Sequence, residues 1–141
     1  MEYTWKFLIY NTVGDYDPPE VARDYSNEIN DRIYLIYDEG AECGLIESLF
    51  YHVSISRCVF VYVTKLFLTN FIKHKEIFSC LIDACEEYNK RLVPVVVESA
   101  LEEYKESKLK ELLKEEPFII KDKLSGQELY SILSEFVDKN Y

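Results

Sequence analysis

Short apolar runs that alternate with amphipathic segments constrain this chain more than any other feature of its sequence. Four runs, at residues 5–10, 32–37, 57–63 and 91–97, are rich in aromatic and β-branched residues and too short for buried helices. They predict buried β-strands, and residues 117–121 are a weaker fifth candidate. Because helical segments separate the runs, we expect parallel strands with right-handed crossovers and helices on both faces. The prediction is an α/β fold with a flavodoxin-like doubly wound five-stranded parallel sheet.

The segments between the runs have the period of amphipathic helices. The first helix is expected to begin within residues 17–20, and Val21, Tyr25 and Ile29 then recur at every fourth residue, as on a buried helix face. Pro94 lies inside the fourth run, where a proline removes a ladder donor, so we expect a bulge or an unpaired amide there. Further helices are expected at residues 45–53, 77–88, 100–115 and after Ser125-Gly126.

Composition limits the classes of function. The 141 residues fit a single domain, 1–141, and 48% hydrophobic residues can fill one core. The net charge of −10 disfavours nucleic acid, and no apolar stretch is long enough for membrane insertion. With no recognisable signal peptide, a soluble cytoplasmic protein is expected. The four cysteines and two histidines match no metal-ligand spacing, so neither a metal site nor a disulfide framework is predicted.

The predicted topology indicates where a site would lie. Doubly wound sheets bind their ligands beyond the carboxyl ends of the strands, where the strand order reverses. The corresponding loops are expected at residues 11–17, 38–44 and 64–75. A response-regulator type of receiver would need paired acids directly after the first strand, whereas Asp15 and Asp17 lie beyond a glycine. A receiver of this type is therefore disfavoured.

Several sequence features recur in a fixed order along the chain. Residues 54–57 contain serines and an arginine before the third predicted strand, Thr64 closes that strand, Glu76 begins the next helix, and Val93-Pro94 lies in the fourth strand. This order resembles that of a Toll/interleukin-1 receptor (TIR) domain over nearly the whole chain. The resemblance implies the same α/β fold and a protein that signals through association of TIR domains.

The resemblance also implies a possible enzymatic activity. Some TIR domains are NAD glycohydrolases, and the glutamate in the helix after the third strand is their catalytic residue, which here is Glu76. A fixed carboxylate would stabilise the positive charge that develops on the ribose as the bond to nicotinamide breaks. NAD would be a substrate, so no cofactor is implied. The NAD-binding residues implied by the resemblance are Asn11, Thr12, Asp38, Gly44 and Leu45.

Two interpretations of these residues remain open. In the leading one the chain is a TIR-type signalling module of innate-immune or cell-death signalling that self-associates with other TIR domains. The alternative is NAD cleavage to nicotinamide and ADP-ribose, or its cyclic form, by Glu76, although the helix dipole alone would favour a carboxylate at that position. The interaction loop expected for self-association comprises Glu39, Gly40, Ala41, Glu42, Cys43 and Gly44.

Overall fold

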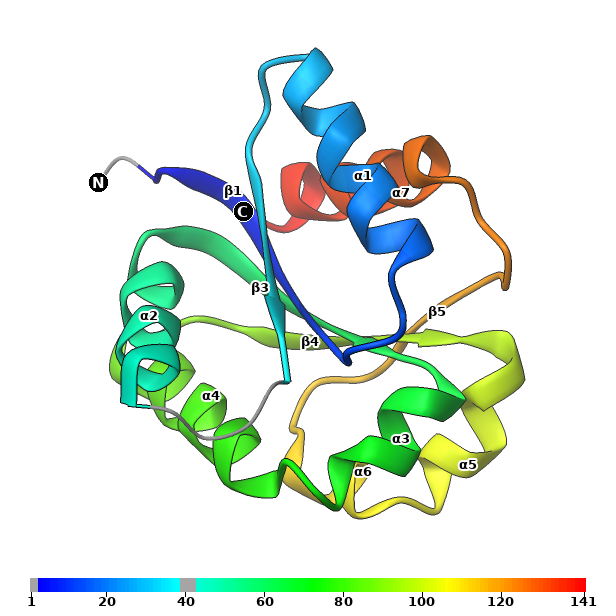
Figure 1. Ribbon diagram of the computed structural model, residues 1–141. Coiled ribbons are helices and arrows are strands. Elements are labelled where there is room, and N and C mark those ends of the chain that lie inside the picture. The colour runs from blue at the N-terminus through cyan, green and yellow to red at the C-terminus, as the bar shows by residue number, and fades with distance from the viewer. Residues whose placement is uncertain (1–2, 39–42) are drawn as a thin grey trace.

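The computed structural model describes residues 3–38 and 43–141 (Figure 1), which form a five-stranded, wholly parallel sheet in the order β2-β1-β3-β4-β5. This order, with helices on both faces, confirms the predicted flavodoxin-like doubly wound fold. The sheet consists of β1 (Trp5–Asn11), β2 (Ile33–Tyr37), β3 (Ser56–Val63), β4 (Leu92–Val97) and β5 (Phe118–Ile120).

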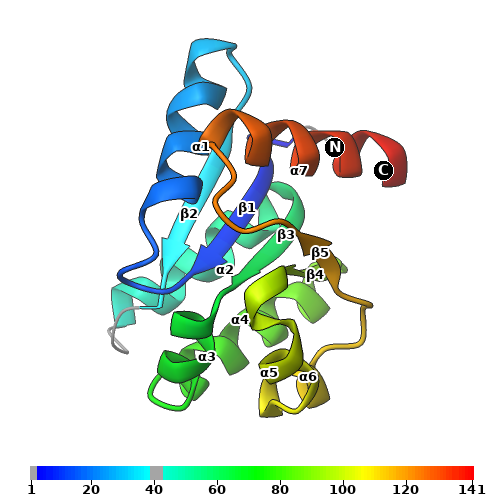
Figure 2. The ribbon, with the colours of Figure 1, turned by 90° about the vertical axis from the view of Figure 1, so that its right-hand side faces the viewer.

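Helices cover the two faces of the sheet unequally. Helices α1 (Asp17–Glu28) and α7 (Gly126–Asn140) pack together on one face, and the other helices cover the opposite face (Figures 1 and 2). No helix within residues 3–38 and 43–141 is long and apolar enough to cross a membrane. The helices on the face opposite α1 and α7 are α2 (Cys43–Ser54), α3 (Lys65–Phe71), α4 (Lys75–Glu87), the 3-10 turn η1 (Glu98–Ala100), α5 (Leu101–Lys105) and α6 (Lys108–Leu112).

The buried face of α1 differs in part from the predicted one. Val21 is 49% exposed and Ile29 is 44% exposed, whereas Ala22 and Ser26 are fully buried. The cause is the close approach of α7, because a Cβ added at Gly126 would lie 2.3 Å from the backbone carbon of Val21. Tyr25 does pack against the core and the ring of Tyr130, as the repeat predicted. Small side chains are needed where two helices come so close, so the apolar repeat marked only part of the buried face.

Two other predictions about local structure were also wrong. The segment 64–75, expected to be a loop, contains α3, whose start is capped by Thr64 Oγ1 accepting from Phe67 N–H at 3.0 Å. The single helix expected over 100–115 is interrupted, because Ser107 caps a separate helix by accepting from Lys110 N–H.

Pro94 does not cause a bulge. The pairing of β4 with β3 runs without interruption through Val61↔Pro94. The ladder between β4 and β5 begins only at Val95, after the proline. Among the described residues, no residue of β5 therefore pairs with Pro94, which has no backbone N–H to donate.

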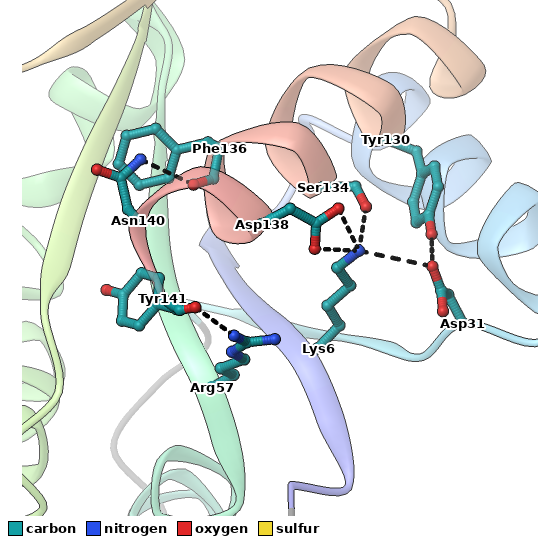
Figure 3. A network of polar contacts seen from close by, with 9 residues as sticks. All are labelled: Lys6, Asp31, Arg57, Tyr130, Ser134, Phe136, Asp138, Asn140 and Tyr141. Carbon is teal, nitrogen blue, oxygen red and sulfur yellow. Dashed lines mark hydrogen bonds and ion pairs between the residues drawn. The ribbon is translucent and has the colours of Figure 1, made fainter.

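A polar network fastens α7 to the amino end of the sheet (Figure 3). The Lys6 ammonium donates to Ser134 Oγ at 2.5 Å and lies 3.1 Å from the Asp138 carboxylate and 3.8 Å from that of Asp31. Tyr130 donates to the same Asp31 carboxylate. Because Tyr130, Ser134 and Asp138 recur every four residues, one stripe of α7 makes all of these contacts. The network fixes the end of α7 that lies opposite the carboxyl ends of the strands.

Candidate functional site

The carboxyl ends of β1 and β2 bring three of the predicted site residues together. Asn11, Thr12 and Asp38 are all buried, at 0%, 0% and 1% exposure. The Asp38 N–H donates to Asn11 O at 2.9 Å, and Asp38 Oδ1 accepts from Val13 N–H at 2.9 Å. The Asp38 side chain therefore closes the turn that leaves β1, so it has a structural role whatever else it does.

The end of β3 joins the same network through hydroxyl and amide groups. Thr64 donates its hydroxyl to the Asp15 carboxylate. Asn70, in α3, donates to Thr12 Oγ1 at 2.7 Å. The loop after β1 is thus held by β2 on one side and by the β3–α3 segment on the other. We call these six residues the rim cluster: Asn11, Thr12, Asp15, Asp38, Thr64 and Asn70.

Three buried polar atoms in or beside the rim cluster have no hydrogen-bond partner among the described residues. They are the Tyr10 hydroxyl, Asn11 Oδ1 and Asp38 Oδ2. Leaving a buried polar group unpaired costs about 1–3 kcal/mol, so such atoms usually meet an ordered water or a ligand. Asn11 does use its amide N–H groups, which donate to Ile36 O at 3.2 Å and Ile9 O at 3.4 Å. The unpaired atoms are two acceptors and one hydroxyl, and Tyr10 and Asn11, as neighbours in β1, point to opposite faces of the sheet.

Burial changes the acid–base properties of this region. Burial, reinforced by the negative charge of Asp38, raises the pKa of the Tyr10 hydroxyl, which therefore stays protonated at neutral pH. Burial also raises the pKa of Asp15, although the hydrogen bond from Thr64 opposes that rise and the Asp38 charge adds to it. The rim cluster has two carboxylates and no basic side chain among its six members, so it would repel an anionic ligand.

Glu76 occupies the first turn of α4 and is exposed to solvent. Within residues 3–38 and 43–141, no hydrogen bond or ion pair joins its carboxylate to the rim cluster. Ile72, just before α4, is 75% exposed. The chain therefore presents Glu76 on an open surface at the start of α4, and its catalytic role stays a prediction.

The predicted interaction loop falls largely outside the described residues. Residues 39–42, which include Glu39, Gly40, Ala41 and Glu42, are not described. Cys43, Gly44 and Leu45 form the start of α2. Their proposed roles, in binding NAD or in self-association, also stay predictions.

Sequence reasoning did not single out Tyr10 or Asn70 as site residues. Tyr10 lies within an apolar run, and its ring packs edge-to-face on Phe67 and Phe78, so its sequence context is that of a core residue. Asn70 lies in the segment that was predicted to be a loop. Nothing in the neighbouring sequence indicates its hydrogen bond to Thr12, which is far away along the chain. Thr64 was visible as a hydroxyl that closes a strand, and Asp15 as an acid after Gly14.

Comparison with known proteins supports the fold only. No protein-family model matches the sequence, and no curated protein matches it either. The structure of a diflavin flavoprotein A3 from Nostoc sp. is similar, with a TM-score of 0.53 and 8% identity over 96% of each chain. A flavodiiron core from Synechocystis gives a TM-score of 0.49 and 7% identity over 97% of this chain and 37% of that one. A designed Rossmann 2x3 protein gives 0.47 and 9% identity, covering 96% of this chain and 91% of the other. At 8% identity, the likeness to the diflavin flavoprotein A3 shows a flavodoxin-like α/β fold alone.

Proposed function

We propose that the chain is a TIR-type signalling module that acts by associating with further copies of itself. The observation that carries the proposal is the open face formed by edge strand β5 and helix α7. A groove of 540 Å³ runs along this face, and Ile119 in the edge strand is 46% exposed beside it. An uncovered strand edge with an apolar side chain is a ready site for pairing with another chain.

Charges on the β5–α7 face are arranged to suit a second copy. Lys121 and Lys139 line the groove together with Glu128 and Glu135, so lysines and glutamates are equal in number. Lys139 already pairs with Glu135 of its own helix at 2.8 Å. In a two-fold interface the same patch meets itself, so Lys121 of one copy can face a glutamate of the other. A chain with a net charge of −10 otherwise repels its copies, which makes a locally balanced face the favourable place for contact.

A charge placed in the strand edge tests the self-association. Ile119→Glu should weaken association at least about tenfold, because a carboxylate would be buried without a partner between two copies. Sedimentation velocity over a range of protein concentrations would measure the dissociation constant. Ile29→Glu is the matched control, since Ile29 is 44% exposed but lies at the end of α1. Equal association by wild type and both variants would reject the β5–α7 face.

The flavoprotein neighbours raise the question of a flavin nucleotide in this chain. In such folds a phosphate binds at the helix N-terminus that follows the first strand, where free N–H groups point at it. Here Pro18 and Pro19 have no N–H, and the Glu20 N–H already donates to Tyr16 O at 3.0 Å. Asp17 adds a negative charge to the same turn. These residues do not fit a phosphate, so a flavin nucleotide has no part in the proposed function.

NAD cleavage is the second candidate, and the unpaired acceptors of the rim cluster favour it. Asp38 Oδ2 and Asn11 Oδ1 are buried acceptors that the hydroxyl groups of a ribose would satisfy. In this reaction the bond between C1′ of the ribose and the nicotinamide nitrogen breaks, nicotinamide leaves with the bonding electrons, and water adds at C1′. Glu76 would stabilise the positive charge on the ribose. Lys73 and Lys75 precede it and are the lysines closest to it along the chain.

Release of nicotinamide from NAD tests this candidate. The assay needs concentrated protein, with and without a crowding agent, because the activity is expected only in the associated state. Glu76→Gln should abolish release, since the neutral amide cannot stabilise a developing cation. Glu87→Gln, at the other end of α4, is the matched control and should keep it. If wild-type protein releases no nicotinamide even when associated, the chain is not an NAD glycohydrolase; equal release by Glu76→Gln would move the chemistry to another residue.

A further inference from the structure

A second concave site lies at the amino end of β4, whereas the rim cluster lies at the carboxyl ends of the strands. A cavity of 340 Å³ opens there between the end of α4, the start of β4 and the end of α6. Its apolar lining comes from Ile82, Cys85, Leu92 and Leu113, and Lys90 and Lys114 also line it. Small-molecule sites range from about 300 to 1,000 Å³ and combine an apolar lining with a few polar groups, so this cavity suits a small ligand.

The turn after α4 fixes the position of Lys90. Asn89 adopts the left-handed conformation, with φ of 54°. Its N–H donates to Glu86 O at 3.3 Å, and the Lys90 N–H donates to Cys85 O at 2.8 Å. This pair of bonds is the Schellman motif that ends many helices. The backbone that carries Lys90 is thus hydrogen-bonded to the last turn of α4, and Lys90 lines the cavity.

Five charged side chains line the cavity, namely Glu86, Lys90, Arg91, Lys114 and Glu115, and among the described residues only Arg91 and Glu115 pair with each other. Arg91 pairs with Glu115, with Nε and one terminal nitrogen at 2.8 and 3.1 Å from the two carboxylate oxygens. Lys90 makes no ion pair within residues 3–38 and 43–141, and its ammonium lies 4.3 Å from the ring centroid of Tyr3. Burial lowers the pKa of Lys90, which shows that its charge is partly desolvated. An ammonium in this situation gains from an anionic partner, because a charge-assisted hydrogen bond replaces lost hydration.

We propose that this cavity binds a small amphipathic carboxylate, such as a medium-chain fatty acid. The apolar tail lies against Ile82, Leu92 and Leu113, and the carboxylate accepts hydrogen bonds from Lys90. The apolar lining rejects small hydrophilic anions, since they leave it unfilled. The cation rejects neutral alcohols of the same length, since they offer no charge. A ligand of this site therefore needs both an apolar tail and a carboxylate.

Titration with octanoate, followed by amide chemical shifts, tests the proposal. Saturable binding is expected, with the largest shifts at residues 82–92 and 112–115. Lys90→Gln should weaken octanoate binding about tenfold, because it removes the charge but keeps most of the side chain. Lys110→Gln, an exposed neighbour in α6, is the charge-matched control and should bind as wild type does. Acetate and 1-octanol should each bind at least about tenfold more weakly than octanoate.

A second variant keeps the test independent of the lysine. Leu112 also lines the cavity and is 45% exposed, so Leu112→Gln should weaken octanoate binding without disturbing the core. Thermal melting of each variant confirms that it is folded. Unchanged octanoate affinity in folded Lys90→Gln, shifts centred away from the cavity, or binding that never saturates would each overturn the proposal.

Discussion

Replacing Gly126 by alanine is expected to destabilise the fold by about 3 kcal/mol and lower the melting temperature by about 10 °C. An added Cβ would lie 2.3 Å from the backbone carbon of Val21 and 2.5 Å from the backbone nitrogen of Ala22. Backbone atoms cannot move aside as a flexible side chain can, so α1 and α7 would have to separate. The higher helix propensity of alanine offsets at most about 1 kcal/mol of this loss. Equilibrium unfolding in urea measures the difference directly.

The matched control for Gly126→Ala is a change at the next residue. Gln127 is exposed, so Gln127→Ala changes the same turn of α7 without adding an atom between the helices. It should leave the free energy of unfolding within about 0.5 kcal/mol of wild type. If Gly126→Ala were equally neutral, α1 and α7 would not be in the close contact that the structure shows.

The fold was largely predictable because its strands are buried on both faces. Residues of β3 and β4 are nearly all apolar, so composition alone marked them as strands, and the helical segments between them required parallel pairing. The buried face of α1 was only partly predictable from apolar spacing. Ala22 and Ser26 are buried because α7 approaches closely, and that requirement comes from a residue more than a hundred positions away.

The candidate site was predictable only in its strand-end residues. The predicted ends of β1 and β2 were enough to place Asn11, Thr12 and Asp38 together, because parallel strands have their carboxyl ends on the same side of the sheet. Asn70 was hidden because its contact with Thr12 spans 58 residues and has no local pattern. Tyr10 was hidden because its ring belongs to the core, and only the structure shows that its hydroxyl lacks a partner.

The rim cluster depends on an aromatic core beneath it, and Phe78→Ala tests that dependence. Phe78 is 1% exposed, and its ring packs edge-to-face with the rings of Tyr10, Phe67 and Phe71, at centroid distances of 5.8, 6.4 and 5.4 Å. These contacts join β1, α3 and α4 in one layer. Truncation to alanine should cost about 3–5 kcal/mol, a large part of the total stability of about 5–15 kcal/mol of an ordinary domain. Urea unfolding measures the loss.

The same variant should affect the site before it affects the opposite end of the molecule. With the ring removed, α3 loses its support, so the amide of Phe67, whose N–H donates to Thr64, should exchange faster with solvent. The amides of α7 should keep their protection at low denaturant, because α7 is fastened by Lys6 at the amino end of the sheet. Phe78→Leu keeps most of the apolar volume and should show a smaller loss in both measurements. Uniform loss of protection in α3 and α7 would mean that the chain unfolds as one unit, and that the rim cluster has no local stability of its own.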